Sequence, residues 1–475
     1  MSGLWTAADA VAATGGRSTG NWVATGVSID TRSLQKGDLF VALTDNRDGH
    51  DFVADALSKG AAAALVSRVP DNLADNVPLL IVDDVLEGLR GLARAARARM
   101  AGKVIGVTGS VGKTGSKEML RCALMGQGRV HAAEKSFNNH WGVPLTLARM
   151  PADTDFAVIE IGMNAPGEIT PLSQLARPHV AVITTVAAVH MQAFDNVRGI
   201  ARAKAEIFDG LEPGGIAILN RDILTYPMLA RAARKRGADL RRFGMHGRPE
   251  FALKSVRVSD AVTTVVYRHN REKGVFKINA PGAHLGMNGL AVLAAVEAVG
   301  GDLARAVIGL GQWAPPEGRG LRYSIRPDIV DDGTITLIDE SYNANPTSMA
   351  AALASLAATQ PTHGTGRVVR GRRIAVLGDM LELGRDEARF HADLAALPSM
   401  DDIDVVHLVG TRMTALAEAL PDRKVGIVTL DATEMVKRVI RTIDAGDVVM
   451  VKGSLGTGLS PIVKAIKTLD TTGNA

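Results

Sequence analysis

The chain has 475 residues, of which 46% are hydrophobic and 22% charged, and its formal net charge is +4. This length is more than one hydrophobic core usually organises, so roughly two to four domains are expected. The aromatic fraction of 4% and the lack of a dense Lys/Arg tract argue against a platform for single-stranded nucleic acid, and the single cysteine, Cys122, excludes an intramolecular disulfide or a cysteine metal cluster.

The sequence shows no targeting or membrane-spanning segment. Its first residues, "MSGLWTAADAVAATGG", lack a basic stretch followed by an apolar one, and no apolar run reaches the length that crosses a membrane. We therefore expect a cytoplasmic protein with neither a membrane nor a nucleic acid as partner. Its mild positive charge suits anionic small substrates.

Residues 1–98 predict a small α/β unit. Short strands are expected within "TGVSID", "GDLFVAL", "AAALVS" and "PLLIVDD". A helix is expected over 49–60, and a longer helix over 85–100 closes the unit.

Residues 99–315 predict a parallel sheet with an antiparallel annex. The apolar runs in "GKVIGVTGS", "DFAVIEIG", "HVAVITTV" and "GGIAILN" have strand length and are separated by helical segments, which is typical of parallel strands joined by crossovers. Residues 251–278 alternate between apolar and polar positions, as antiparallel strands do. A helix, "LGMNGLAVLAAVEAVG", follows, and "QWAPPEGRG" at 312–320 is expected to be a linker.

Residues 316–475 alternate strand and helix patterns regularly. Strands are expected at "TITLIDE", "RIAVLGD", "DVVHLVG", "KVGIVTL" and "DVVMVKG", each followed by a helical segment. This pattern predicts a doubly wound sheet.

A glycine-rich turn joins the first strand of the second unit to the next helix. The strict phosphate-loop pattern would need a glycine where Val107 stands, and the glycines are at Gly106 and Gly109 instead. The strand "KVIGV" and the helix "SKEMLRCALM" nevertheless flank the turn, so its amides and the helix N-terminus can bind an anion. Lys113 would reach nucleotide phosphates and Thr114 a Mg²⁺ ion. The alternative is a turn that contains Gly-Lys-Thr by coincidence.

Three residues at the ends of the following β-units add groups that metal–phosphate chemistry needs. Glu160 lies inside an apolar strand, His190 follows another strand, and Lys204 begins a helix. Each could have a bland role alone, as a cap, a hydrogen-bonded side chain or a solvated lysine. Together, downstream of a phosphate loop, they favour a catalytic site.

The ordered motifs "TGSVGKT", "SFNNHWGVPLTLAR", "VIEIGMNAPGEI", "VAAVHMQAF", "AKAEIF", "DESYNANPTSM", "AVLGDMLELG" and "VKGS" extend along essentially the whole chain. They resemble the ATP-dependent Mur ligases of peptidoglycan synthesis. The resemblance implies an α/β fold of three domains: a UDP-substrate domain at 1–98, a central P-loop ATPase domain at 99–315, and a C-terminal Rossmann-like ligase domain at 316–475.

The resemblance also assigns residues to the site. For ATP it implies Gly109, Ser110, Val111, Gly112, Lys113, Thr114, Gly115, His284, Asn288, Arg319, Asp339 and Asn343. For Mg²⁺, of which two ions are expected, it implies Thr114, Glu160, His190 and a carbamylated Lys204. For the muramyl substrate it implies Ser28, Thr31, Arg32, Asn138 and Asn139. The catalytic set is Lys113, Lys204, His190 and Arg319.

The reaction that the resemblance implies is amide-bond formation driven by ATP, in a monomer. "ESYNANP" favours UDP-N-acetylmuramoyl-tripeptide and D-alanyl-D-alanine as substrates, joined through an acyl phosphate, and the tripeptide's third residue stays open between diaminopimelate and lysine. The alternatives are a sister ligase that adds a diamino acid, a folate-polyglutamate-type synthetase, and a P-loop switch or kinase. A plain binding module would not explain the three site residues at 160, 190 and 204.

Overall fold

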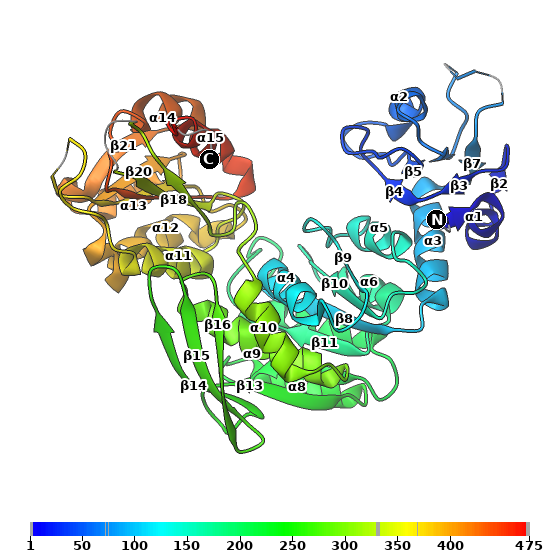
Figure 1. The fold of residues 1–475 in the computed structure, drawn as a ribbon, viewed down its shortest axis with the longest axis horizontal. Helices are drawn as coiled ribbons and strands as arrows, with labels where there is room; N and C mark the ends of the chain where they lie inside the picture. The colour runs from blue at the N-terminus through cyan, green and yellow to red at the C-terminus, as the bar shows by residue number, and fades with distance from the viewer. Residues whose placement is uncertain (1–2, 72, 75, 329–332, 368, 472–475) are drawn as a thin grey trace.

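Three α/β units follow one another along the chain and form a V (Figure 1). The computed structural model describes residues 3–71, 73–74, 76–328, 333–367 and 369–471. The central unit lies at the apex, and the N-terminal and C-terminal units form the two arms. The α/β class and the three-unit architecture predicted from the sequence are confirmed.

The N-terminal unit is built on a five-stranded sheet in the order β2-β7-β6-β5-β4, in which only β2 is antiparallel to its neighbour. Its elements are β1 (Trp5–Thr6), α1 (Ala7–Thr14), β2 (Arg17–Ser18), β3 (Val23–Ala24), β4 (Gly26–Ser28), β5 (Asp38–Val41), α2 (Val53–Ser58), β6 (Ala63–Val66), β7 (Leu79–Ile81) and α3 (Val85–Arg99). The single helix expected over 49–60 is instead a 3-10 turn, Gly49–Phe52, followed by α2. The Asp48 side chain accepts from the His50 amide and so begins the tighter turn.

The central unit is built on nine strands in the order β16-β15-β14-β13-β12-β11-β8-β10-β9, and only β14, β15 and β16 pair antiparallel. The predicted annex therefore extends the parallel sheet through β13 and β14. The strands are β8 (Lys103–Thr108), β9 (Val130–Ala132), β10 (Phe156–Glu160), β11 (Val180–Ile183), β12 (Ile216–Asn220), β13 (Asp239–Gly244), β14 (Phe251–Val258), β15 (Thr263–His269) and β16 (Glu272–Ile278).

Helices cover both faces of this sheet. Residues of α4 (Lys113–Leu124), α9 (Ala283–Ala298) and α10 (Leu303–Gln312) pack into one apolar cluster, and residues of α5 (Gly142–Ala148), α6 (Ile169–Ala176), α7 (Val197–Ala205) and α8 (Tyr226–Lys235) pack into another. With a core on each face, the sheet fixes where its strands end, and the site residues follow those ends.

The C-terminal unit has six strands in the order β17-β18-β22-β19-β20-β21, of which only β17 is antiparallel. Its elements are β17 (Leu321–Ile325), β18 (Ile335–Glu340), α11 (Pro346–Ala358), β19 (Arg373–Gly378), α12 (Glu387–Ala392), β20 (Val405–Val409), α13 (Thr414–Ala419), β21 (Val425–Thr429), α14 (Ala432–Val439), β22 (Val448–Lys452) and α15 (Ser460–Lys467). The doubly wound sheet expected there is present.

The two outer units contact the central unit differently. Leu145 and Ala148 of α5 belong to the apolar cluster of the N-terminal unit, and Trp5 Nε1 donates to the Ala148 carbonyl at 2.9 Å. The apolar clusters of the C-terminal unit contain only its own described residues, and its contacts with the central unit include polar ones such as Arg322 Nη1 to the Asp260 carbonyl at 2.8 Å. Among the described residues, an apolar cluster therefore joins the central unit to the N-terminal unit but not to the C-terminal one.

The limits expected at 98/99 and 315/316 stay predictions. The first falls in the last turn of α3, and the second lies in the linker after α10. Within the described residues, no helix is both long and apolar enough to cross a membrane.

Candidate active site

The glycines of the loop after β8 are required by its backbone and its neighbours. Gly109 has φ +153° and Gly112 has φ +85°, conformations that side chains disfavour. A Cβ on Gly109 would lie 1.9 Å from Thr184 Oγ1, and a Cβ on Gly112 would lie 3.0 Å from the Asn288 amide. The unusual glycine spacing therefore belongs to a tightly packed turn that leads into α4, which begins already at Lys113.

Hydrogen bonds from neighbouring strand ends hold this loop in shape. Thr184, directly after β11, donates through Oγ1 to the Val111 carbonyl at 2.6 Å. Ser110 Oγ donates to the Ala187 carbonyl at 3.1 Å and accepts from the Ala187 amide at 2.9 Å. Lys113 Nζ donates to the Gly109 carbonyl at 2.7 Å, across the turn. The loop is thus pre-formed, which is what an anion site needs.

Lys113 is half-buried, and its surroundings act on its charge. Burial lowers the pKa of Lys113, the carboxylate of Glu160 opposes that shift, and Arg319 adds to it. An anionic ligand at the loop would stabilise the Lys113 ammonium, because it would offset both burial and the neighbouring guanidinium.

Glu160, at the end of β10, lies beside the first turn of α4. Its Oε1 accepts from Thr114 Oγ1 at 3.1 Å and from Asn138 Nδ2 at 2.7 Å. Ser136 Oγ lies 2.8 Å from Thr114 Oγ1 and accepts from Arg319 Nη2 at 3.0 Å. Two hydroxyls, one carboxylate and one amide therefore converge next to the phosphate loop.

The second carboxylate oxygen of Glu160 fits a metal ligand. Glu160 is 1% exposed, and within the described residues its Oε2 is buried without a hydrogen-bond partner. A buried carboxylate oxygen without a partner is costly unless a cation joins it. Oxygen donors from Glu160 and Thr114 are the type that Mg²⁺ prefers, so these residues fit the ion that the resemblance implies.

His190 and Lys204 both lie close enough to Lys113 for its charge to lower their pKa values. His190 Nδ1 is 2.5 Å from Glu382 Oε2 of the C-terminal unit, and burial lowers its pKa while Glu382 opposes the shift. Lys204, expected at a helix start, lies instead in the last turn of α7, because the helix already begins after its Asn196 cap. Lys204 is 1% exposed, and burial, together with the charge of Lys113, holds its pKa well below the usual lysine value. Within the described residues, no cluster of three or more His, Cys, Asp or Glu side chains forms a ready metal site.

A cavity of about 490 Å³ extends from the loop to the C-terminal unit. Its lining also includes Leu285, Met287 and Trp313, whose apolar surfaces suit a flat heterocycle. The cavity therefore combines anion-binding groups with apolar ones. The predicted site residues that line it are Ser110, Val111, Gly112, Lys113, Thr114, Gly115, Asn138, Glu160, His190, His284, Asn288, Arg319 and Asn343.

Four other residues predicted for the ATP, metal and tripeptide sites lie outside the lining of this cavity, and the side chains of Asp339 and Asn139 have local partners. Asp339 accepts from the Gly318 amide and from Ser341. Asn139 Oδ1 accepts from the Gly142 amide at the start of α5. Gly109 and Lys204 both interact with the lining residue Lys113: the Gly109 carbonyl accepts from Lys113 Nζ, and the charge of Lys113 lowers the pKa of Lys204.

The residues expected for the uridine nucleotide lie in the N-terminal unit, after β4. Ser28 Oγ donates to the Asp30 carbonyl at 3.2 Å, and Arg32 pairs with Asp30 at 2.7 Å while remaining exposed. Neither they nor Thr31 lines the cavity. They stay predictions.

Several lining residues were not identified from the sequence: Ser136, Thr184, Glu340, Tyr342 and Lys452. The guanidinium of Arg319 lies 4.3 Å from the Tyr342 ring centre. Lys452, 1% exposed, donates to Glu340 Oε2 at 3.1 Å and to the Asn343 carbonyl at 2.9 Å. Glu340 and Tyr342 lie in the motif "ESYNANP", and Lys452 lies in "VKGS". The motifs therefore pointed to this part of the chain without indicating what each residue does.

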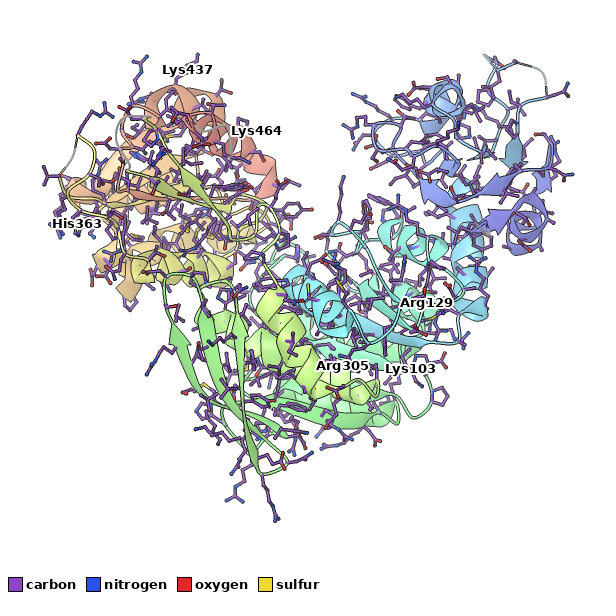
Figure 2. The ribbon with its side chains drawn as sticks, in the orientation of Figure 1. Lys103, Arg129, Arg305, His363, Lys437 and Lys464 are labelled. Atoms are coloured by element: carbon purple, nitrogen blue, oxygen red, sulfur yellow. The ribbon has the colours of Figure 1, made fainter. Side chains whose placement is uncertain are left out.

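Some of the other cations lie on the outer surface of the molecule. Lys103, Arg129 and Arg305, labelled in Figure 2, are exposed on the outer surface of the central unit, and Lys437 and Lys464 are exposed on the C-terminal unit. None of the five lines the cavity. The cations that face it, Lys113, Arg319 and Lys452, are those available to an anionic ligand.

Comparison with known proteins identifies the class. The middle domain of Mur ligases matches residues 107–296, their glutamate ligase domain matches 325–455, and the catalytic domain of the Mur ligase family matches 23–97. The chain belongs to the Mur ligase family. The resemblance predicted from the motifs is confirmed.

Full-length relatives carry one particular name within that family. The UDP-N-acetylmuramoyl-tripeptide–D-alanyl-D-alanine ligase of Bacillus subtilis (strain 168) is 37% identical over 449 residues, 92% of each chain. A crystal structure of MurF from Acinetobacter baumannii superposes with a TM-score of 0.81 and 28% identity, over 98% of this chain and 99% of that one. MurF from Thermotoga maritima, solved in complex with ADP, shares the fold with a TM-score of 0.75 at 24% identity, over 94% of this chain and 97% of that one.

Proposed function

We propose that the protein joins D-alanyl-D-alanine to UDP-N-acetylmuramoyl-tripeptide with ATP as the energy source. The observation that carries the proposal is the cavity that the central phosphate loop and the "ESYNANP" segment line together. Relatives similar over nine-tenths of the chain bear the name of this reaction. These names favour this reaction over the sister-ligase and P-loop-switch alternatives.

ATP would bind with its phosphates at the loop and its base against the apolar surfaces of Leu285, Met287 and Trp313. Lys113, the amides of the loop and the guanidinium of Arg319 would contact the phosphates. His284 and Asn288, at the start of α9, and Asn343 would line the nucleoside side. When bound by Thr114 and Glu160, Mg²⁺ would neutralise charge on the phosphates.

The reaction would take two steps. A terminal carboxylate oxygen of the tripeptide attacks the γ-phosphorus, and the bond from that phosphorus to ADP breaks, giving an acyl phosphate. The amine nitrogen of D-alanyl-D-alanine then attacks the acyl carbon and loses a proton, and inorganic phosphate leaves with the C–O bonding pair. Lys113 and Arg319 would stabilise the negative charge that develops on the transferred phosphoryl group.

Lys204 is the candidate for carbamylation. Its buried position beside Lys113 disfavours the ammonium form, and the neutral amine is the form that adds CO₂. A carbamate would replace a like-charge neighbour of Lys113 with an anion. The modified side chain would then be an oxygen ligand for a second Mg²⁺, and Glu160 and His190 would be further ligands of that ion.

Closure of the C-terminal unit would complete the site. An acyl phosphate hydrolyses, so water must be excluded before it forms. The polar contacts between the C-terminal and central units can exchange as the linker at 312–320 moves. Ser28, Thr31 and Arg32 would hold the uridine nucleotide on the other arm, and Asn138 would face the tripeptide.

Phosphate release with matched amines tests the proposal. With UDP-muramyl tripeptide and MgATP present, release should require D-alanyl-D-alanine and should not respond to a free diamino acid or to glutamate. Release with a diamino acid would favour the sister ligase, and release without any amine would favour a P-loop switch or kinase. Either result would overturn the assignment.

A further inference from the structure

Lys117 is a fully buried cation one helical turn after Thr114. Its exposure is 0%, and its Nζ donates to the carbonyl of Ala133 and, at 3.4 Å, to that of Lys135. The same Nζ pairs with Glu118 Oε1 at 2.7 Å. Lysines are almost never fully buried unless they are paired, because desolvating the ammonium is costly. A lysine that binds backbone carbonyls from another segment must contribute to holding that segment.

The segment that Lys117 holds has no regular structure. Residues 133–138 follow β9 and contain neither helix nor strand. Beyond the bonds from Lys117, the segment is tied by the Gly162 amide, which donates to the Asn138 carbonyl at 2.8 Å. Lys117 therefore fixes the beginning of this segment to α4, and Gly162 fixes its end.

The side chains of this segment reach the phosphate–metal site. Ser136 lies between Thr114 and Arg319, and Asn138 donates to the same Glu160 oxygen that Thr114 contacts. The helix that carries Lys113 and Thr114 thus also carries, on its next turn, the cation that sets where Ser136 lies. The contact between Ser136 and the hydroxyl of Thr114 depends on the distance between α4 and this segment, while Asn138 links the same segment to the Glu160 oxygen that Thr114 contacts.

We infer that Lys117 is a positioning residue for metal-dependent nucleotide binding. It acts by locking residues 133–136 onto α4, so that Ser136 and Asn138 order the Thr114 hydroxyl and the Glu160 carboxylate. The inference rests on the proposed function only in taking the loop as a MgATP site. It does not depend on which amine the enzyme adds.

The test is equilibrium binding of a fluorescent, non-hydrolysable ATP analogue, titrated in Mg²⁺ and in EDTA. Lys117→Met keeps the length of the side chain and removes its donors and charge. Its binding in Mg²⁺ should weaken about tenfold or more, which is typical for partners that orient metal ligands, and its binding in EDTA should change much less. A double mutant with Ser136→Ala should lose less than the sum of the two single losses, because both changes act on the same contact.

Lys424 of the C-terminal unit provides a matched control. It is also buried, and its Nζ donates to the carbonyls of Met400, Asp401 and Ile403 at 2.7–3.0 Å. Lys424→Met should lower the melting temperature and leave the Mg²⁺ dependence of analogue binding unchanged. If Lys117→Met does not fold, Lys117→Gln retains a donor for one carbonyl and should show an intermediate loss.

Two results would overturn the inference. One is a folded Lys117 variant with the wild-type Mg²⁺ dependence, and the other is an equal loss in Mg²⁺ and EDTA, which a merely structural lysine would give. Failure of the proposed function looks different: the wild type would bind the analogue with Mg²⁺ yet form no product with D-alanyl-D-alanine.

Discussion

The Thr114 hydroxyl lies 3.1 Å from one carboxylate oxygen of Glu160, and the other oxygen of that carboxylate is buried without a partner among the described residues. The first turn of α4 and the end of β10 thus meet at a carboxylate of which only one oxygen has hydrogen-bond partners. Such a group costs free energy in the empty protein, and a bound cation would recover that cost.

Glu160→Gln should separate stability from activity. The amide oxygen can still accept from Thr114 and Asn138, and the buried carboxylate oxygen that lacks a hydrogen-bond partner is removed. The melting temperature of the ligand-free variant should therefore equal or exceed that of the wild type, while turnover falls about a hundredfold or more. Differential scanning fluorimetry and phosphate release measure the two effects. A variant that keeps wild-type turnover would remove Glu160 from the metal site.

Gly109→Ala should abolish phosphate binding. An alanine at this position would have to adopt φ +153°, which side chains disfavour, and its methyl group would overlap Thr184 Oγ1. The loop would therefore have to move. Gly311→Ala, in α10, is the matched control. Its Cβ would meet only the Lys277 carbonyl, at an ordinary contact distance of 3.9 Å. The substitution should stabilise the helix by about 0.5–1 kcal/mol. Isothermal titration with MgATP compares the variants, and equal affinities would show that the loop shape is unimportant.

The sequence predicts the parts of this site that depend on local pattern. The strand–turn–helix around Gly109 and Gly112 follows from hydrophobic periodicity and glycine placement, and Glu160 is conspicuous as a carboxylate in an apolar strand. Ser136 has no such signal, because an irregular segment brings it to Thr114 through tertiary contacts. Thr184 looks like any threonine at a strand end until its bond to the loop is known.

Local capping explains why some motif residues lie outside the cavity. Asn139 caps α5 through the Gly142 amide, and Asp339 orders the turn at Gly318 and Ser341. A motif is specific for a family, but it does not separate residues that touch the ligand from residues that shape the chain beneath it.

Helix α1 was not predicted from the sequence, although Thr6 and Asp9 form its N-terminal hydrogen bonds.

Arg319→Lys should impair nucleotide use although the charge is kept. Lysine cannot both bond Ser136 and stack on Tyr342, and the lost cation–π contact is worth about 1–2 kcal/mol, or roughly tenfold in kcat/KM for ATP. Among ring variants, Tyr342→Phe should retain more activity than Tyr342→Leu. Steady-state kinetics in ATP checks the order, and the reverse order would contradict the stacking role.

Acid should destabilise the C-terminal unit through His407. Burial, aided by Arg372 and Arg438, lowers the pKa of His407 to about 4, and its Nδ1 accepts from the Ile427 amide at 2.9 Å. The unfolded chain, with a histidine pKa near 6.5, binds more protons, so stability is lost as pH falls from about 6.5 toward 4.

His407→Gln retains an acceptor and removes that proton site. Between pH 7 and pH 5 the wild type should lose roughly 2 kcal/mol more stability than the variant. Denaturant unfolding at both pH values measures the difference. Parallel pH dependence of the two proteins would mean that His407 does not govern this response.

The most direct measurement follows an oxygen atom through the reaction. UDP-muramyl tripeptide labelled with ¹⁸O in its terminal carboxylate is incubated with MgATP and D-alanyl-D-alanine, and the products are analysed by mass spectrometry. We predict a nucleotide product heavier by the dipeptide residue, and one ¹⁸O atom transferred to inorganic phosphate for each amide bond formed. Phosphate without the label, or no product that contains the dipeptide, would contradict the account.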